Sequence, residues 1–501
     1  MKSLKTALIN QVKDRFDERE MALLEKAIDF IEEYHKNQKR LTGESFINHP
    51  LRVALFLAQI KLDFNTIIAG LLHDIVEDTD INLQKIKSEF NEEIAFLVQS
   101  LTKINKLRYQ KSNNQSEDSI LQQQIDQENF RNMILAMAKD LRVIIIKLVD
   151  RLDNMKTLWA LPLEKQKRKA QETLDIFAPL AYRLGLTDIG AQLEDLSFPY
   201  VYPREYKLTR QIVGKKREQL ENYLKSIVPI LEKALKEANI KPLEIKYRTK
   251  HLYSIWRKLQ KEEMDIKRVY DLVAMRLIMR SVSDCYAALG VIHSLWKPVP
   301  QRFKDYIALP KPNGYQSLHT TVFAEDGRIV EIQIRTKEMD EEAEWGIASH
   351  WFYEQIKNTK TYKKRKNYVP PKRFYWIKQL QEWQKKFYNT NDPQQFLEFL
   401  KIDFFKDRIF VLTPKGDVID LPEGATPIDF AYQVHTEIGN QAIGAKVNGK
   451  LVPLDYELKS GEVVEIITKK GKLPSSSWLE FVKMAETKKK IEEALRRNKL
   501  F

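Results

Sequence analysis

The sequence has a single cysteine, Cys285, among its 501 residues. One cysteine excludes a disulfide framework and a zinc site built on several thiolates. No apolar run reaches the roughly 20 residues that a membrane-spanning helix needs. The first ten residues lack the apolar core and the small-residue cleavage site of a secretory signal peptide. We therefore expect a cytoplasmic protein without a membrane partner.

Glycine is also scarce, at 16 residues, and no segment repeats in the manner of a solenoid. The sequence has neither a Gly-x4-Gly-Lys-Ser/Thr phosphate-binding loop nor the kinase signatures, which disfavours an ordinary kinase or ATPase. With 43% hydrophobic and 30% charged residues, the composition is that of a folded chain with about three domains. The net charge of +14 suits an anionic partner, although a solvated lysine-rich surface explains it equally well.

The hydrophobic pattern changes along the chain. Helical spacing predicts helices over 51–62, 67–76 and 133–152 and a long charged helix over 212–237. The following region is β-rich, with interrupting helices, and its predicted strands cover 243–247, 269–279, 320–324 and 329–334. Residues 357–373 hold eight Lys or Arg residues and two prolines, typical of a basic linker that either contacts nucleic acid or is a solvated hinge. A small β-rich unit with hairpin turns at 414–417, 448–449 and 460–461 precedes a helical tail over 477–501.

Two histidines and two aspartates of the helical region have the residue types of a metal site. His73 and Asp74 are adjacent in an apolar predicted helix, His49 precedes a proline, and Asp150 follows another apolar run. A charged aspartate in such surroundings costs several kcal/mol unless it is paired or bound to a metal. Imidazole and carboxylate ligands suit Mn²⁺, Fe²⁺ or Zn²⁺. Each residue alone has a structural explanation, but the four together favour a metal-dependent phosphohydrolase.

Further polar residues belong to the same segments. Glu77 and Asp78 follow His73 and Asp74 by about one helical turn, so either is placed to act as general base on a water molecule. The donors suited to phosphate are Arg40, Lys147, Arg151 and Asn154.

The β-rich region concentrates cations around two strand carboxylates. Asp271 opens one predicted strand, and Glu331 shares a face of another with Gln333 and Arg335. Solvent explains a polar strand face as well as an active site does. Carboxylates with many cations are nevertheless what magnesium-assisted transfer of a polyphosphate group needs. Tyr315, in a glycine-containing loop, is placed either to stack on a base or to pack on the sheet.

The motifs of the helical region resemble one enzyme family. His35-Lys-Asn-Gln-Lys-Arg-Leu-Thr-Gly43, Leu72-His-Asp-Ile-Val-Glu-Asp-Thr79 and Lys147-Leu-Val-Asp-Arg-Leu-Asp-Asn-Met155 are similar to the HD hydrolase domain of long RelA/SpoT alarmone synthetase/hydrolases. The resemblance implies that Mn²⁺ binds His49, His73, Asp74 and Asp150. It also implies catalytic or water-positioning roles for Glu77 and Asp78, and substrate contacts for Arg40 and Asn154.

The second region resembles the synthetase domain of the same family, through Arg248–His251, Arg302-Phe-Lys-Asp305, Pro312-Asn-Gly-Tyr-Gln-Ser317 and Val330-Glu-Ile-Gln-Ile-Arg-Thr336. By this resemblance Asp271 and Glu331 bind Mg²⁺, and Glu331 activates the guanosine 3′-hydroxyl. Tyr315 stacks on guanine, and Arg248 and Arg276 flank adenine. The residues implied to hold phosphates or otherwise to bind the nucleotides are Lys250, Ser254, Lys258, Lys304, Lys311, Asn313, His319, Gln333 and Arg335.

The β-rich unit near the end resembles a TGS domain, a ubiquitin-like β-grasp, through Val411–Asp417, Asp429–Ile438 and Val447-Asn-Gly449. The resemblance implies that deacylated tRNA and the ribosome are partners and that His435 touches the tRNA 3′ end. By its position alone, His435 is a surface histidine.

The sequence thus predicts a multidomain protein. Its parts are an all-α HD-type hydrolase domain (1–155), a helical connector (156–240), an α+β nucleotidyltransferase-like synthetase domain with a mixed sheet (241–356), a basic linker and helix (357–404), a TGS domain (405–470) and a helical tail (471–501). The resemblance implies a bifunctional stringent-response enzyme that transfers pyrophosphate from ATP to the 3′-hydroxyl of GDP or GTP and hydrolyses the 3′-pyrophosphate of (p)ppGpp. Two alternatives stay open, a hydrolase whose synthetase half only binds nucleotide and a tRNA- or ribosome-binding regulator with vestigial catalysis.

The sequence departs from the family at a few positions. Asp153 stands where the family usually has histidine, and Asn37, Ser45 and Tyr247 also differ from the usual residues. We expect the metal ligands to be intact and the substrate contacts near Asp153 to be altered. The sequence ends soon after the TGS region, so we expect either a shortened form of a longer protein or a natural short form.

Overall fold

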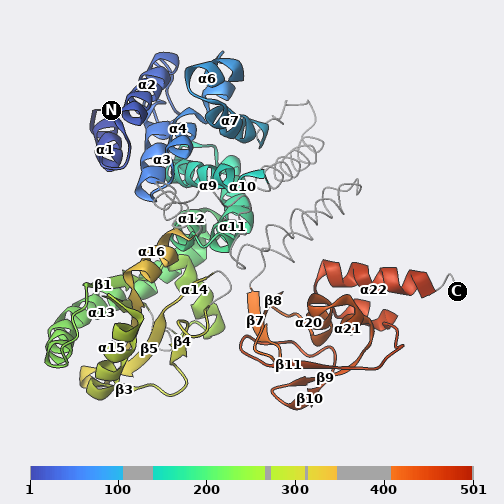
Figure 1. Cartoon of the computed structure of the whole chain (residues 1–501). Coiled ribbons are helices and arrows are strands. Elements are labelled where there is room, and N and C mark those ends of the chain that lie inside the picture. The colour runs from blue at the N-terminus through green and yellow to red at the C-terminus, as the bar shows by residue number, and fades with distance from the viewer. Residues whose placement is uncertain (1, 105–138, 266–271, 311–313, 347–407, 499–501) are drawn as a thin grey trace. The chain divides into compact units, whose positions relative to one another are not determined.

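The computed structural model describes residues 2–104, 139–265, 272–310, 314–346 and 408–498 (Figure 1). Contacts divide the chain into two compact units, one made of residues 1–108 and 132–381 and the other of residues 109–131 and 382–501. In the described ranges, no helix has both the length and the apolar composition that crossing a membrane demands.

The first unit begins with helices. They are α1 (Lys2–Val12), α2 (Glu18–Tyr34), α3 (Asn48–Gln59), α4 (Phe64–Leu72), α5 (Ile75–Asp78), α6 (Leu83–Glu89), α7 (Glu92–Ile104) and α9 (Leu141–Lys156). Helices α3, α4 and α9 pack together through side chains without exposed surface, such as Leu57, Ile68 and Ile144. Asp63 and Asp140 cap α4 and α9 by accepting hydrogen bonds from backbone N–H groups of the first turn. The predicted helix over 133–152 is confirmed from residue 141; residues 133–138 lie outside the described residues.

The prediction of one helix over 67–76 is wrong. Helix α4 ends at Leu72, α5 begins at Ile75, and His73 and Asp74 form the turn between them. The Nδ1 atom of His73 lies 2.9 Å from the carbonyl oxygen of Gly70. An uninterrupted helix would offer that carbonyl to the backbone N–H of Asp74, so the side chain competes with the helix for it.

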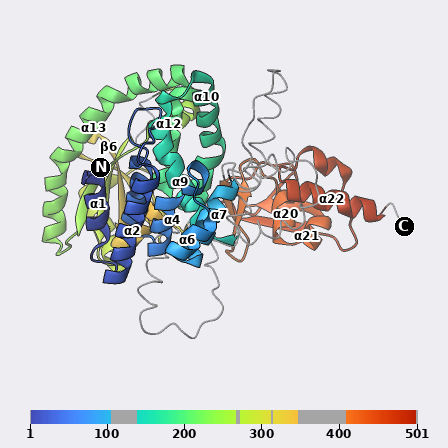
Figure 2. The same ribbon diagram turned by 90° about the horizontal axis from the view of Figure 1, so that it is seen from above.

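A second group of helices connects this region to the sheet. It comprises the 3-10 turn Leu158–Ala160, α10 (Leu163–Glu172), a π-helical turn Thr173–Phe177, α11 (Ala178–Arg183), α12 (Thr187–Val201) and α13 (Pro203–Glu237). The predicted helix over 212–237 is confirmed as part of α13. This 35-residue helix follows a long arc in the view of Figure 2.

A buried carboxyl group on α12 makes the stability of this helical region depend on pH. Glu194 accepts a hydrogen bond from the Tyr182 hydroxyl at 2.8 Å, and burial raises its pKa to about 7. The folded state therefore binds a proton on the Glu194 carboxyl group more tightly than the unfolded state does. This protonation stabilises the folded state fully below the unfolded pKa of 4.5, and the stabilisation is lost as the pH rises through 7.

The glutamine of Glu194→Gln keeps an acceptor for Tyr182 but does not titrate. We therefore expect the variant to escape the loss of folding stability at high pH, which is at most about 3 kcal/mol. The variant should therefore melt at nearly the wild-type temperature at pH 5 and at a higher temperature at pH 8. Thermal unfolding followed by circular dichroism at both pH values measures this difference. Equal pH dependence in the two proteins would contradict the assignment.

The rest of the first unit is built on a mixed sheet. Its elements are β1 (Glu244–Thr249), α14 (Leu252–Lys261), β2 (Val273–Met279), α15 (Val282–Leu295), β3 (Lys297–Pro298), β4 (Lys304–Asp305), β5 (Leu318–Phe323), the 3-10 turn Glu325–Gly327, β6 (Ile329–Thr336) and α16 (Lys337–Trp345). The strand order is β1-β2-β6-β5-β3, and β4 also pairs with β5. Strands β2 and β6 are parallel and the other pairs antiparallel, which confirms the predicted mixed sheet.

The two faces of this sheet differ in polarity. One face carries apolar side chains, such as Leu277 and Ile332, which join α13, α14 and α15 in a single buried cluster. The opposite face carries the charged residues of β2 and β6. Helix α16 lies against that part of the sheet and also contacts both groups of helices. The hydroxyl of Thr187, the first residue of α12, donates to the carbonyl of Ala343, and Lys61, which follows α3, pairs with Glu341.

The second unit is described from residue 408. Its elements are β7 (Arg408–Leu412), β8 (Val418–Pro422), α20 (Pro427–Val434), α21 (Thr436–Asn440), β9 (Ala442–Val447), β10 (Lys450–Val452), β11 (Val464–Thr468), the 3-10 turn Ser476–Glu480 and α22 (Ala485–Asn498). The turns at 414–417 and 448–449 join antiparallel strands as predicted, and Asn448 and Gly449 both have positive φ. The turn at 460–461 instead leads into β11 without joining two strands of a hairpin. The tail helix begins at Ala485, eight residues later than predicted.

Candidate functional site

Two histidines and two aspartates converge between α3, α4, α5 and α9. Ligand atoms of His49, His73 and Asp74 all lie within 4.8 Å of one another. His49 Nε2 is 3.6 Å from Asp74 Oδ2 and 3.3 Å from Asp150 Oδ1. His73 Nε2 is 3.1 Å from Asp74 Oδ2 and 3.8 Å from Asp150 Oδ1. The four residues that the sequence nominated are thus brought together from distant segments around one point.

The donor set fits a divalent metal. His73 Nε2 is buried without a hydrogen-bond partner, although it faces two carboxylates. Because Nδ1 of the same ring lies beside the Gly70 carbonyl, that contact selects the tautomer with its proton on Nδ1 and leaves the Nε2 lone pair for a metal. Burial lowers the pKa of His73, but Asp74 and Asp150 outweigh burial and raise it well above its ordinary value. A cation therefore belongs among these groups, either a proton or a metal ion.

Asp150 is held in place by its own helix. Lys147 Nζ lies 2.8 Å from Asp150 Oδ2, and the Asn154 amide donates to Asp150 Oδ1. Arg40 in turn donates to the amide oxygen of Asn154. Arg40, Lys147 and Asn154, all expected to bind phosphate, are therefore joined to Asp150: Lys147 contacts one carboxylate oxygen, and Asn154, itself contacted by Arg40, the other.

The other residues expected near this site lie on two of the same helices, α9 and α5. Arg151 is buried, pairs with Glu172 at 2.9 Å and lies over the ring of Phe177. Glu77 is half-buried and Asp78 exposed, and both lie on α5, in the turn that follows Asp74.

A row of polar residues crosses the second region's sheet. In the register of five neighbouring strands, Lys246 of β1 lies opposite Arg276 of β2, Arg276 opposite Gln333 of β6, Gln333 opposite His319 of β5, and His319 opposite Lys304 of β4. Residues directly opposite one another point to the same face of a sheet. Four of these five residues, all but Lys246, are predicted from the sequence to bind nucleotide, and the strand pairing brings them onto one face.

Asp340 of α16 gathers the cations at one end of this row. Its carboxylate lies 3.0 Å from Arg276 Nη1, 2.6 Å from Arg335 Nη2 and 3.3 Å from Lys246 Nζ. Glu344, one turn later, lies 3.0 Å from the same Arg276 atom. Arg335 has no exposed surface, so in this conformation its guanidinium faces Asp340 and is closed to a phosphate. Sequence reasoning missed Asp340 and Glu344 because an acidic helix such as 337–345 usually has a solvated face.

The polar face of β6 continues with Glu331. Its Oε1 atom accepts a hydrogen bond from Gln333 Nε2 at 2.9 Å and lies 3.5 Å from His319 Nδ1. The Tyr315 hydroxyl lies 2.7 Å from His319 Nε2. Tyr315, His319 and Glu331 therefore form a continuous chain from the loop before β5 to the carboxylate expected to act as base. Gln333 is buried and Glu331 half-buried, so this face is covered and not simply solvated.

The remaining nominated residues of this region are only partly described. Ser254 and Lys258 lie one turn apart on α14. Lys250 lies two residues before this helix, and its backbone N–H donates to the carbonyl oxygen of Leu272. Asp271, Lys311 and Asn313 lie outside the described residues, and so does the side chain of Arg248.

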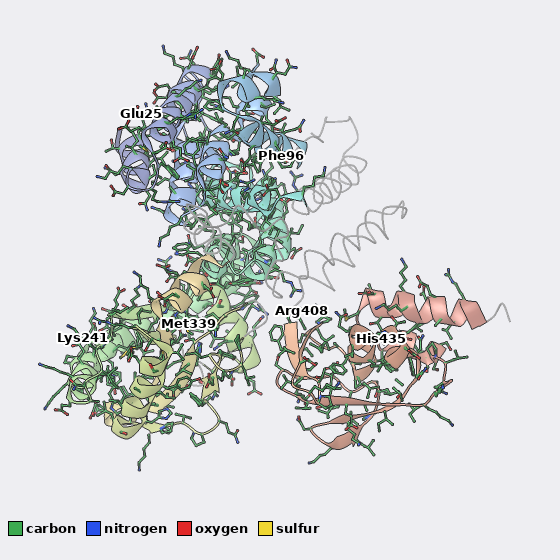
Figure 3. The ribbon with its side chains drawn as sticks, in the orientation of Figure 1. Glu25, Phe96, Lys241, Met339, Arg408 and His435 are labelled. Atoms are coloured by element: carbon green, nitrogen blue, oxygen red, sulfur yellow. The ribbon has the colours of Figure 1, made fainter. Side chains whose placement is uncertain are left out.

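His435 lies on the second unit, between α20 and α21, where Figure 3 labels it. It is exposed, as its position in the sequence predicted, and its Nδ1 atom accepts a hydrogen bond from the backbone N–H of Glu437. Its ring caps α21 and remains accessible at the surface.

Three segments of the chain match known domain families. Residues 27–187 match the HD domain, residues 247–358 match the region found in RelA / SpoT proteins, and residues 409–468 match the TGS domain. The cluster of His49, His73, Asp74 and Asp150 falls within the first match, the polar row from β2 onward within the second, and His435 within the third.

Several curated proteins are similar to nearly the whole of this chain. The chain is 49% identical over 475 residues to the guanosine-3′,5′-bis(diphosphate) 3′-pyrophosphohydrolase of Aquifex aeolicus, covering 95% of this chain and 64% of that protein. It is 44% identical over 472 residues to the GTP pyrophosphokinase of Myxococcus xanthus, covering 94% and 60%. It is 43% identical over 480 residues to the bifunctional (p)ppGpp synthase/hydrolase RelA of Mycobacterium tuberculosis, covering 95% and 63%. The chain therefore spans less than two thirds of each of these relatives.

Proposed function

We propose that the chain is a bifunctional stringent-response enzyme of the RelA/SpoT family that makes and hydrolyses (p)ppGpp. The observation that carries the proposal is the presence of two separate polar sites in one chain. One is the cluster of His49, His73, Asp74 and Asp150 in the HD region. The other is the polar sheet face with Glu331 in the RelA/SpoT region.

We propose that the first site hydrolyses the 3′-pyrophosphate with Mn²⁺ held by His49, His73, Asp74 and Asp150. When bound, such an ion would supply Lewis-acid stabilisation of phosphate charge and would lower the pKa of a water molecule. Glu77 or Asp78 takes a proton from the attacking water, and Arg40 and Asn154 orient the substrate. Lys147 and Arg151 add positive charge beside the phosphates. The water oxygen bonds to the phosphorus of the 3′-pyrophosphate, the bond from that phosphorus to the ribose 3′-oxygen breaks, and the 3′-oxygen takes up a proton, so that GDP or GTP and pyrophosphate leave.

We propose that the second site transfers pyrophosphate from ATP to GDP or GTP with Mg²⁺ held by Asp271 and Glu331. Glu331 accepts the proton of the 3′-hydroxyl, whose oxygen attacks the β-phosphorus of ATP. The bond from that phosphorus to the α-phosphate breaks, and AMP leaves. Tyr315 stacks on guanine, and Arg248 and Arg276 flank adenine. The residues proposed to hold phosphates or otherwise bind the nucleotides are Lys250, Ser254, Lys258, Lys304, Lys311, Asn313, His319, Gln333 and Arg335.

Incubation of the purified protein with its proposed substrates tests both halves separately. With ppGpp and Mn²⁺, anion-exchange chromatography should resolve GDP and pyrophosphate as the products. With ATP, GDP and Mg²⁺, the same method should resolve AMP and ppGpp. Release of inorganic phosphate in place of pyrophosphate, or of ADP in place of AMP, would contradict the proposed reactions.

We further propose a cytoplasmic enzyme that binds deacylated tRNA, and through it the ribosome, with the TGS domain. The support is the family match and the exposed ring of His435 at the start of α21. An imidazole at a helix N-terminus is suited to contact the terminal ribose or phosphate of an RNA strand.

Replacement of His435 by alanine is expected to weaken the binding of deacylated tRNA by roughly tenfold, the loss of one or two hydrogen bonds. Leu451→Ala is a matched control, because Leu451 is 73% exposed in the same unit and carries no polar group. Filter binding at fixed ionic strength measures both variants, since phosphate contacts make such affinities depend on salt. Equal affinity of wild type and His435→Ala would argue against this contact.

A further inference from the structure

Asp153 lies behind the metal ligand His49, on the side away from the cluster. Its Oδ2 atom is 2.7 Å from Nδ1 of His49, while Nε2 of the same ring points to Asp74 and Asp150. Both residues are buried, with exposed fractions of 5% for Asp153 and 2% for His49. The two ring nitrogens thus have separate partners, a carboxylate on one side and the metal ligands on the other.

Two arginines hold the Asp153 carboxylate itself. Arg52, one turn after His49 on α3, donates from Nε to Oδ1 at 2.7 Å and from Nη2 to Oδ2 at 3.0 Å. Arg40 reaches Oδ2 at 3.3 Å. Glu44 fixes Arg52 from the other side with two further contacts, at 2.9 and 3.0 Å. The carboxylate is therefore locked in position by groups that are not metal ligands.

We propose that Asp153 is a positioning residue that orients His49 for the metal. This inference rests on the proposed metal site. The short contact to Nδ1 keeps the ring proton on that atom and leaves the Nε2 lone pair for the ion. A carboxylate in this place also makes the imidazole a better donor, and such partners commonly change metal affinity by about 10–100-fold. Asp153 thus supports the ligand His49, a role separate from the altered substrate contacts expected from the sequence.

The neighbouring histidine ligand shows that the arrangement is specific to His49. His73 receives its orientation from a backbone carbonyl, that of Gly70, which no side-chain substitution removes. Orientation of His49 instead depends on a single replaceable side chain. Removal of that side chain should therefore weaken the site without dismantling its four ligands.

Titration of the full-length protein with Mn²⁺ alone, with free Mn²⁺ measured by electron paramagnetic resonance, tests the proposal. Asp153→Ala is expected to bind Mn²⁺ 10–100-fold more weakly than wild type. Asp153→Asn, whose amide oxygen still accepts from His49 Nδ1, should lose less. Asp140→Ala is the matched control. Asp140 is the N-cap residue of α9, the helix that carries Asp153, and it too pairs with an arginine, Arg142, at 2.7 Å. The control should bind Mn²⁺ within twofold of wild type.

The outcomes separate this inference from the metal site on which it rests. If wild type fails to bind Mn²⁺, the proposed metal site is wrong. If wild type binds and Asp153→Ala binds equally well, the site stands and the positioning role is overturned. An equal loss in Asp140→Ala would also overturn it, because the effect would then be a general loosening of α9. Thermal melting checks that each variant is folded, and Asp153→Asn carries the test if the alanine variant does not fold.

Discussion

Replacement of His73 and Asp74 together by alanine is expected to lower hydrolysis of ppGpp by on the order of a thousandfold or more. The double substitution removes two of the four groups whose ligand atoms converge. The remaining pair, His49 and Asp150, cannot hold a divalent ion in a closed set of ligands. Pyrophosphate release from ppGpp in the presence of Mn²⁺ measures the effect directly.

A matched double variant in the same helical region controls for damage to the fold. Asp29→Ala/His35→Ala removes the same two residue types from α2 and its C-terminal end, where His35 is buried and stacks on Phe46. This variant should hydrolyse ppGpp within about tenfold of wild type, since its losses are those of packing and one hydrogen bond. Synthesis from ATP and GDP should survive in both variants. Hydrolysis at the wild-type rate by His73→Ala/Asp74→Ala would contradict the metal site.

Glu331→Gln is expected to lower synthesis of ppGpp by about 10²–10⁴-fold, the usual contribution of a general base. The substitution keeps the size of the side chain and an oxygen that can accept a hydrogen bond from Gln333 Nε2. It removes the carboxylate, which is the group proposed to take the proton of the 3′-hydroxyl. AMP formation from ATP and GDP measures the rate. Hydrolysis of ppGpp by the same preparation should be unchanged, because His49 and its neighbours belong to a different region.

Glu325→Gln is the matched control for this substitution. Glu325 is exposed in the turn that joins β5 to β6, so it tests removal of one carboxylate close in sequence to Glu331. Its synthesis rate should equal that of wild type. If Glu331→Gln also synthesises at the wild-type rate, Glu331 is not the base. If wild type binds ATP and GDP without forming AMP, the alternative of a hydrolase with a nucleotide-binding second half is favoured.

The proximity of His49, His73, Asp74 and Asp150 could be predicted from sequence because these residues break strong apolar patterns. Asp74 and Asp150 each adjoin runs of buried aliphatic side chains, where an unpaired carboxylate is costly. The turn at His73 and Asp74 could not be predicted in the same way, because hydrophobic spacing continues through it. The turn coincides with a contact between the His73 ring and the Gly70 carbonyl, which periodicity does not record.

The polar sheet face could be predicted only in part. Alternation along β6 placed Glu331, Gln333 and Arg335 together, but the row from Lys246 to Lys304 needs the register of five strands. The role of Asp340 depends on α16 folding back onto the end of β6, a tertiary contact with no local signal.

Asp153 shows how little a departure from a family pattern says about the partners of the new residue. From sequence it pointed to altered substrate binding, because the family usually has histidine there. In the structure its carboxylate faces Nδ1 of His49 and is held by Arg52, three residues after His49 in the chain. The relevant partner was thus set by the packing of α3 on α9, which the residue itself does not reveal.

The most direct test of two separate sites in one chain uses ppGpp labelled in its 3′-pyrophosphate together with three proteins, wild type, His73→Ala/Asp74→Ala and Glu331→Gln. Each protein is assayed by anion-exchange chromatography for labelled pyrophosphate with Mn²⁺, and for AMP from ATP and GDP with Mg²⁺. We predict that wild type forms both products, that the double variant forms only AMP, and that Glu331→Gln forms only labelled pyrophosphate. Loss of both products in either variant, or of neither, would contradict the assignment of two independent active sites.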